Sequence, residues 1–270
     1  MSRRGPAALA LATLVLLLSV AAPAPGGTAD QVGATFSLMA NDFIKAFQPV
    51  EGLVAAINAE VVYVDIGARA GAVPGQELTV FRKAGSFVHP ITGKTLGRYE
   101  QVLGYAQIRR VQANFSEAVF IAAPTAPAPR VEDGVRITRG RIRLAITPLL
   151  DLSQSPGDAR RIPFMLASAL ERSKRFVVVD PLVVTDALAK QALRVEEVLA
   201  QPERAVQMAA TLEVSAWLVP VLLERNGVKY LDATWISGVT GTPLFSRRQA
   251  LVPPSALEEQ RFPWEPRAED

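Results

Sequence analysis

The sequence predicts an α+β protein in which a small all-β unit, preceded by a helix, is followed by an α/β unit with a mixed sheet. Three observations lead to this expectation. Short strand-like runs separated by glycines fill residues 50–119. After Gly140, apolar residues recur alternately at strand and at helix spacing. Between the two patterns lies a segment with three prolines, residues 122–129.

The first 29 residues have the features of a secretory signal peptide. Arg3 and Arg4 form a positive start, residues 7–22 are apolar, and Gly27-Thr28-Ala29 is a candidate cleavage site before Asp30. Cleavage there would lower the formal net charge from +3 to +1. The chain has no cysteine, so it offers no lipoprotein attachment site. We therefore expect a periplasmic protein that is not a lipoprotein; an uncleaved leader that anchors the chain is the alternative.

Residues 30–47 form the first helix that the sequence predicts. Apolar side chains recur there at helical spacing and would form one stripe. Such a stripe could lie on a membrane surface or pack on the helix's own domain, and Lys45 is its one basic residue. We expect packing within a first domain that spans residues 30–139. The stripe comprises Phe36, Met39, Ala40, Phe43, Ile44 and Phe47.

The all-β unit follows the helix. Alternating runs at residues 60–67, 77–82, 102–111 and 115–122, with glycines between them, predict a small barrel or sandwich. The proline segment cannot be a central strand, because proline lacks the N–H that a strand ladder needs. It is either a semi-rigid linker or a long loop within the barrel. Because residues 131–137 still resemble a turn and a last strand, we place the domain boundary near Arg139-Gly140.

Residues 140–252 predict an α/β domain with a mixed sheet of about five strands. A strand at 142–146 precedes a helix whose buried face includes Ile162 and Leu166. Asp180 and Pro181 begin another helix, as cap and first residue. Asn226-Gly227 predicts a tight hairpin that joins a strand at 215–224 to a strand at 228–237. Residues 253–270 predict a flexible proline-rich tail.

The residues that most enzymes need are scarce, and we expect no enzyme, no cofactor and no metal. His89 is the single histidine and precedes a proline in a turn, which favours a structural role. Four aspartates could supply paired carboxylates for glycoside hydrolysis, but no spacing links them: Asp151, Asp158, Asp180 and Asp186. No phosphate-binding loop is present. An envelope hydrolase is therefore the least favoured function.

Two features are candidate partner-binding sites. Arg139, Arg141 and Arg143 alternate along the first strand of the α/β unit, and a strip of guanidinium groups could bind a carboxylate-bearing partner. A solvated face is the simpler interpretation. Trp264 is unusual in a solvated tail and could dock back, anchor a partner or be exposed. The balance of charge gives no reason to expect nucleic-acid binding.

The α/β unit resembles the amino-terminal domain of TolB and the related CsgG, LpoB and FlgO-type domains of the bacterial envelope. The resemblance rests on Arg143–Leu149, Leu170–Asp180 and Leu212–Val219, completed by 231–234 and 240–244. It covers about 110 residues.

The all-β unit resembles the carboxy-terminal domain of the flagellar H-ring protein FlgT, an SH3-like barrel. The matching residues are Val62–Gly67, Gly71–Val80 and His89–Gly97. The FlgT family also has a TolB-like module, although here the order is reversed. Together the resemblances imply a non-enzymatic periplasmic adaptor or scaffold of the flagellar basal body or of another envelope assembly. Its partners would be other envelope proteins, or further copies of itself in a ring. A CsgG- or LpoB-type secretion or peptidoglycan-synthesis accessory protein near the outer membrane or peptidoglycan is the alternative.

Overall fold

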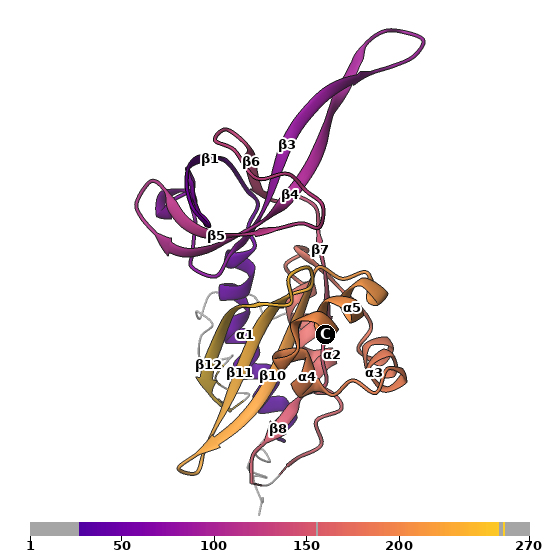
Figure 1. Cartoon of the computed structure of the whole chain (residues 1–270). Coiled ribbons are helices and arrows are strands. Elements are labelled where there is room, and N and C mark those ends of the chain that lie inside the picture. Colours follow the sequence, from indigo (N-terminus) through magenta and orange to yellow (C-terminus); the bar gives the residue numbers. More distant parts are fainter. Residues whose placement is uncertain (1–26, 155, 254–255, 257–270) are drawn as a thin grey trace, which may run out of the picture.

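The computed structural model describes residues 27–154, 156–253 and 256, and it contains two β-sheets that share no strand (Figure 1). The predicted signal peptide up to residue 26 and the tail beyond residue 256 lie outside the described residues. The first helix, α1 (Thr28–Ala46), already includes Thr28 and Ala29. Cleavage after Ala29 would therefore remove its first two residues. None of the described helices is long and apolar enough to cross a membrane.

The all-β unit is a closed barrel with the strand order β1-β2-β5-β4-β3-β6. Its strands are β1 (Val50–Asn58), β2 (Val61–Val64), β3 (Glu77–Val88), β4 (Thr95–Val111), β5 (Ser116–Ala122) and β6 (Gly134–Ile137). A short 3-10 turn, η1 (Ala68–Ala70), follows β2. The proline segment connects β5 to β6, which pairs with both β1 and β3 and closes the barrel. It is thus a loop of the barrel and not a linker.

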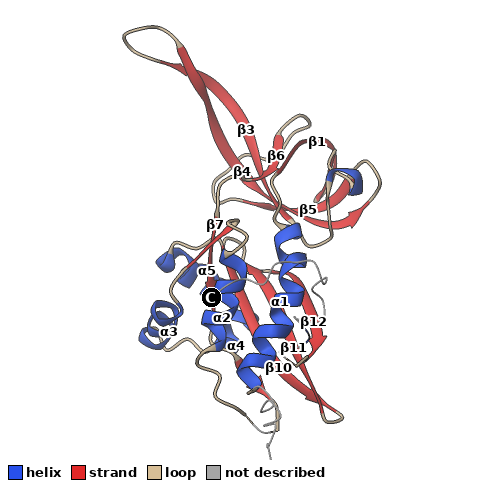
Figure 2. Ribbon diagram, turned by 180° about the vertical axis from the view of Figure 1, so that it is seen from behind, coloured by secondary structure: helices blue, strands red, loops and turns tan. Residues whose placement is uncertain are grey.

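The α/β unit has a six-stranded mixed sheet covered on both faces (Figures 1 and 2). The strand order is β12-β11-β10-β7-β9, and β8 pairs with β10 beyond the end of β7. Its elements in chain order are β7 (Ile142–Ile146), β8 (Leu150–Leu152), α2 (Ile162–Glu171), β9 (Phe176–Val178), α3 (Pro181–Lys190), α4 (Val195–Ala200), α5 (Pro202–Leu212), β10 (Ala216–Arg225), β11 (Val228–Ser237) and β12 (Pro243–Ala250). Asp180 caps α3 as expected, with its Oδ1 accepting a hydrogen bond from Leu182 N at 2.8 Å.

Helix α1 packs on the α/β sheet and not on the barrel with which we grouped it. The helix lies beside α2 and against β11 and β12 (Figure 2). Phe43 and Phe47 contact Trp235 of β11, with ring centroids 6.1 Å and 4.2 Å apart. Large apolar side chains on this sheet face need a cover, and α1 buries them together with α2. The opposite face packs on α3, α4 and α5, where Trp217 Nε1 donates to Ala205 O at 3.1 Å.

The barrel is therefore inserted into the α/β unit, between its first helix and its first strand. The chain leaves α1 at Phe47 and returns to β7 through Thr138 and Gly140. Buried Arg175 holds both crossings together: Nε donates to Phe47 O at 2.5 Å, Nη2 to Thr138 O at 2.6 Å, and Nη1 to Gly140 O. Nothing in the sequence marks Arg175 for this role.

The two units also share buried apolar residues. One continuous cluster runs from the barrel interior, around Val80 and Ile108, to the sheet face beneath α1. At the interface, Gly75 lies so close to β12 that a Cβ would come within 2.5 Å of Leu244 O, and its φ of +86° also favours glycine. The barrel and the sheet face beneath α1 therefore share one apolar core.

Replacing Phe43 with alanine should lower the free energy of unfolding by about 3–5 kcal/mol, because a fully buried ring is lost from the α/β core. Chemical denaturation followed by tryptophan fluorescence measures this, since Trp235 is a direct neighbour. Asp42→Ala is the matched control on the same helix. It removes only a half-exposed ion pair with Arg247 and should cost less than about 1 kcal/mol. Equal losses would contradict the packing of α1 on this sheet.

The hairpin between β10 and β11 provides a second test of the fold. Asn226 and Gly227 have φ of +51° and +74°, as a type I′ turn requires. Gly227→Val should destabilise the protein by about 1–3 kcal/mol through backbone strain alone, because a Cβ at this position meets no atom within 4 Å. Gly227→Asn should cost clearly less, because asparagine tolerates the left-handed region. Thermal unfolding of both variants measures the difference.

Candidate interaction surface

The feature that best fits contact with another molecule is a two-stranded arm. Strands β3 and β4 run on beyond the barrel as a long twisted ribbon that projects away from both units (Figure 1). Their pairing continues outward from Lys83↔Glu100 to Val88↔Thr95. We call residues 83–100 the arm.

Large apolar side chains of the arm are exposed. Ile91 at the tip is 88% exposed and Tyr99 is 61% exposed. The rings of Phe87 and Tyr99 pack together, with centroids 5.1 Å apart, and Gly97 leaves room for Phe87 on the facing strand. An exposed apolar group of this kind on a folded domain is typical of a binding surface. The exposed apolar residues of the arm are Phe87, Val88, Ile91, Leu96 and Tyr99.

The tip of the arm is an ordered turn built around His89. His89 N donates to Lys94 O at 2.8 Å, and Gly93 N donates back to His89 O at 2.9 Å. The His89 ring accepts two further backbone hydrogen bonds at Nδ1, from Ile91 N at 3.2 Å and Thr92 N at 3.3 Å. The single histidine thus structures the turn, as the sequence indicated, and the turn presents Ile91.

The arm is also positively charged. Residues 84–99 contain Lys94 and Arg98 and no acidic residue, and Lys83 lies at the base. All three cations are exposed. A partner that accepts the arm would therefore have to combine apolar surface with negative charge.

Two ion pairs fix the base of the arm to the barrel. Arg82 binds Asp133 through two hydrogen bonds of 2.8 Å and 2.7 Å, and Arg136 binds Glu100 at 3.1 Å and 2.6 Å. Burial raises the pKa of Asp133, but the hydrogen bonds from Arg82 and from Arg130 N outweigh it and the net pKa is lowered. The hydrogen bonds from Arg136 lower the pKa of Glu100. Arg136 also lies over the Phe81 ring, 4.2 Å from its centroid. These contacts set the direction in which the arm leaves the barrel.

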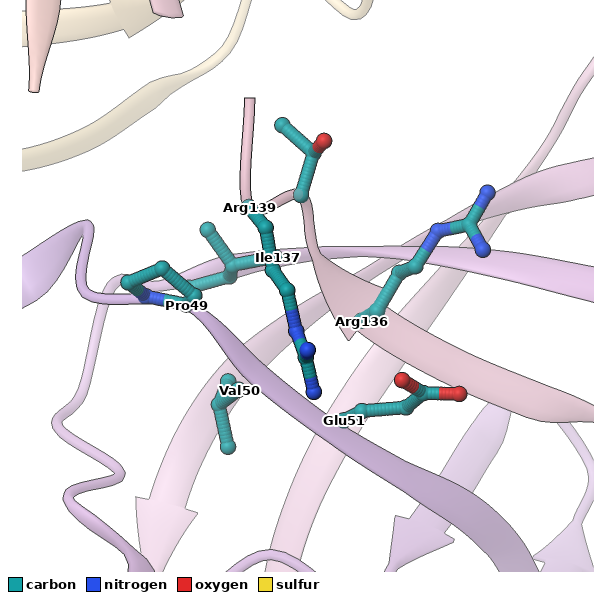
Figure 3. A pocket seen from close by; sticks show the side chains of 7 residues that line it. Pro49, Val50, Glu51, Arg136, Ile137 and Arg139 are labelled. Carbon is teal, nitrogen blue, oxygen red and sulfur yellow. The ribbon is translucent and has the colours of Figure 1, made fainter. Parts of the chain in front are cut away.

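The three arginines of the predicted strip have different surroundings. Arg139 lies in a pocket of about 270 Å³ at the foot of the barrel, where its side chain extends toward Val50 and Glu51 (Figure 3). Arg141 Nη2 donates to Phe176 O at 2.8 Å, on the outer edge of β9. Arg143 is exposed on β7. Only Arg143 is thus part of a strand, and a shared role in partner binding stays a prediction. Trp264 lies outside the described residues.

Arg141 has a structural task that the sequence did not reveal. Strand β9 is an edge strand, so the backbone groups on its outer side have no strand partner. Arg141 donates a hydrogen bond to the Phe176 carbonyl, and Glu171 Oε1 accepts one from Val178 N at 3.3 Å. Both side chains therefore protect this edge from pairing with another strand.

The four aspartates that could have formed a hydrolytic pair are each held by local partners. Asp151 accepts hydrogen bonds from Ser153, Asp158 pairs with Arg160, Asp180 caps α3, and Asp186 pairs with Lys190. The hydrogen bonds from Arg160 lower the pKa of exposed Asp158 to about 2. Within the described residues, no group of three or more histidine, cysteine or acidic side chains could hold a metal ion.

The sequence pattern placed His89 in a turn of a small barrel, whereas residues 89–97 form the end of a long ribbon. The available signal was the spacing of Gly85, Gly93 and Gly97 among apolar residues that no predicted core element needed.

No family model matches the chain. A protein of Aquifex aeolicus (strain VF5) is 32% identical over 83 residues, and these are 31% of this chain and 16% of that protein. The chain thus spans a small part of that relative's length. Among solved structures, the chain is similar to the LpoB C-terminal domain from Salmonella enterica, with 16% identity and a TM-score of 0.36 over 42% of this chain and 84% of that one. It is also similar to lipoprotein GNA1162 from Neisseria meningitidis, with 16% identity and a TM-score of 0.34 over 41% and 79% of the two chains.

Replacing His89 with alanine should loosen the tip of the arm and leave the rest of the protein unchanged. The variant removes the acceptor of two backbone hydrogen bonds in an exposed turn, a local loss of about 0.5–1.5 kcal/mol. Hydrogen exchange at the Ile91 and Thr92 amides should accelerate while the melting temperature stays the same. His89→Asn is the control, because an asparagine side chain can accept the same backbone donors. If both variants loosen the tip equally, the ring nitrogen does not hold this turn.

Proposed function

We propose that this chain is an exported, non-enzymatic protein of the cell envelope that works by binding another protein through the arm. The arm is the observation that carries the proposal: an ordered tip, exposed aromatic and aliphatic side chains, and two cations, Lys94 and Arg98, in a stretch from 84 to 99 without acidic residues. Envelope location is supported by the predicted signal peptide. The absence of cysteine and the local pairing of the aspartates agree with a role in binding.

The energetics of the arm also support this proposal. An isolated two-stranded ribbon is at best marginally stable in water, and additional strands or packing are needed to stabilise it. The arm lies far from the α/β unit (Figure 1). Its large apolar side chains remain in solvent. A partner that covers Ile91 and Tyr99 would remove this apolar area from water, at a gain of roughly 25 cal/mol for each Å². Aromatic residues in such a position often dominate the energy of an interface.

Edge-to-edge strand addition is not the binding mode that the arm favours. Its pairing is interrupted by register shifts near residues 83–86 and 87–88, Gly85 and Gly97 lie within its strands, and Pro90 lies in its turn. Bulges, prolines and lysines are the devices by which exposed edges avoid pairing with another strand. Recognition would therefore depend on the side chains of the arm.

Within this proposal, the sequence resemblances suggest two specific roles. The TolB, CsgG and LpoB-like segments fall on β7, β9 and β10, which are adjacent parallel strands, so they form one structural unit. This favours an accessory protein of the LpoB type, acting in peptidoglycan synthesis at the outer membrane, as the second and more specific candidate. A flagellar H-ring role, an SH3-like identity of the barrel and assembly into a ring rest on the FlgT resemblance and stay predictions.

A photo-crosslinking amino acid in place of Ile91 tests the proposed function in cells. We expect a specific crosslinked band to an envelope protein, because Ile91 is the most exposed large apolar residue of the arm. Lys190 on α3, which is also exposed, is the matched control position and should give no such band. A substitution of both Ile91 and Tyr99 with serine should remove the partner from pull-down experiments while changing the melting temperature by no more than about 2 °C. If the double variant retains its partner, the arm is not the contact.

A further inference from the structure

A partly buried carboxylate joins the barrel to the α/β unit at the foot of the arm. Glu77 is the first residue of β3, the strand that continues outward into the arm. Its Oε1 accepts a hydrogen bond from Ser237 Oγ at 2.8 Å, and its Oε2 accepts from Thr240 Oγ1 at 3.2 Å. Ser237 and Thr240 belong to the end of β11 and the turn after it, so both bonds cross between the units.

Gln107 of β4 completes this cluster from the barrel side. Its Nε2 lies 2.9 Å from Glu77 Oε2 and 3.2 Å from Thr240 Oγ1, and it also contacts Thr242. The cluster of Glu77, Gln107, Ser237 and Thr240 is thus a polar part of the interface between the two units.

The charged groups around Glu77 are all engaged elsewhere. Arg109 Nη2 donates to Gln107 Oε1 at 3.0 Å, Arg136 binds Glu100, and Arg141 binds the Phe176 carbonyl. Among the described residues, no cation forms an ion pair with Glu77. Tyr105, from β4, lines the same interdomain pocket as Glu77, Arg136 and Arg141. Burial raises the pKa of Tyr105, and the negative charge of Glu77 raises it further.

Burial is also the dominant influence on Glu77. It raises the pKa of the carboxyl above its usual 4.5, although the hydrogen bonds from Gln107, Ser237 and Thr240 lower it in part. A group whose pKa is raised in the docked state binds its proton more tightly there than when the units separate. Docking is therefore favoured at low pH and weakens as the pH rises through the pKa of the docked state.

We infer that Glu77 is a proton-operated latch that sets how firmly the barrel, and with it the arm, is held on the α/β unit. Protonation of Glu77 removes a negative charge that no cation neutralises, and this strengthens the docking of the two units. Ionisation loosens it, while the shared apolar cluster keeps the units together. This inference concerns the orientation of the arm and holds whatever partner the arm binds.

Distance measurements between the arm and the α/β unit test the latch. Because the chain has no cysteine, spin labels can be placed at Lys94 and Lys190 through two introduced cysteines. In the wild type, titrated from pH 4 to pH 8, we expect a distance distribution that is narrow at the acid end and broadens as the pH rises through the pKa of Glu77 in the docked state. Glu77→Gln, which keeps the shape without the charge, should stay narrow across this range. Glu60→Gln, an exposed glutamate of the barrel, should behave as the wild type.

Ser237→Ala is a milder variant that keeps the test valid if changes at Glu77 prevent folding. It removes one donor to the carboxylate, so the midpoint of the broadening should move to higher pH. The inference is overturned if the wild type and Glu77→Gln share one pH profile, if the distribution narrows as the pH rises, or if Ser237→Ala moves the midpoint to lower pH.

Discussion

The burial of Trp235 beneath helix α1 is the interaction on which the rest of this structure depends. Phe43 and Phe47 reach across the sheet to this side chain, and Phe176 and Phe245 surround it, with centroids 5.5 Å and 6.3 Å away. Without α1, the part of this apolar sheet face around Trp235 would be open to water. The helix that precedes the barrel in sequence therefore belongs to the α/β unit, and the barrel becomes an insertion whose position is fixed at both ends.

An inserted domain has two connections, and here both pass the same buried guanidinium. Arg175 binds carbonyl groups on the outgoing and on the returning chain, which ties the crossings to the start of β9. Its side chain is 7% exposed, and burial lowers its pKa. Arginine suits this place because its fork of donors reaches several carbonyls at once. With Glu77 bonded across the interface as well, the barrel is held by apolar packing, by the clamp at the crossings and by the polar cluster. The direction of the arm follows from these contacts.

The arm combines a well-held base with a weakly packed outer part. A rigid base, made by the pairs Arg82–Asp133 and Arg136–Glu100, carries a ribbon with little packing of its own. Elements that bind partners are commonly drawn from the locally less stable parts of a protein, and the arm fits this description. Because β3 begins at Glu77 and ends at the tip of the arm, a change at the interface acts on the element that carries the exposed side chains.

The sequence by itself determined most of the local structure. Periodicity and caps located the helix at 162–171, the Asp180 cap, the Asn226-Gly227 turn and the strands after Gly140 other than β8, because each depends on residues close together in the chain. It also identified the turn role of His89. Only the tertiary structure decided where α1 packs, that the barrel is inserted, and that residues 83–100 leave the barrel as an arm. It alone brought Glu77 to Ser237 and Arg175 to Phe47, residues 160 and 128 positions apart. An apolar stripe indicates that one face of a helix is buried, but not against which surface. Alternating residues indicate a strand, but not where that strand leaves the barrel. Those choices depend on contacts distant in sequence, which no local pattern contains.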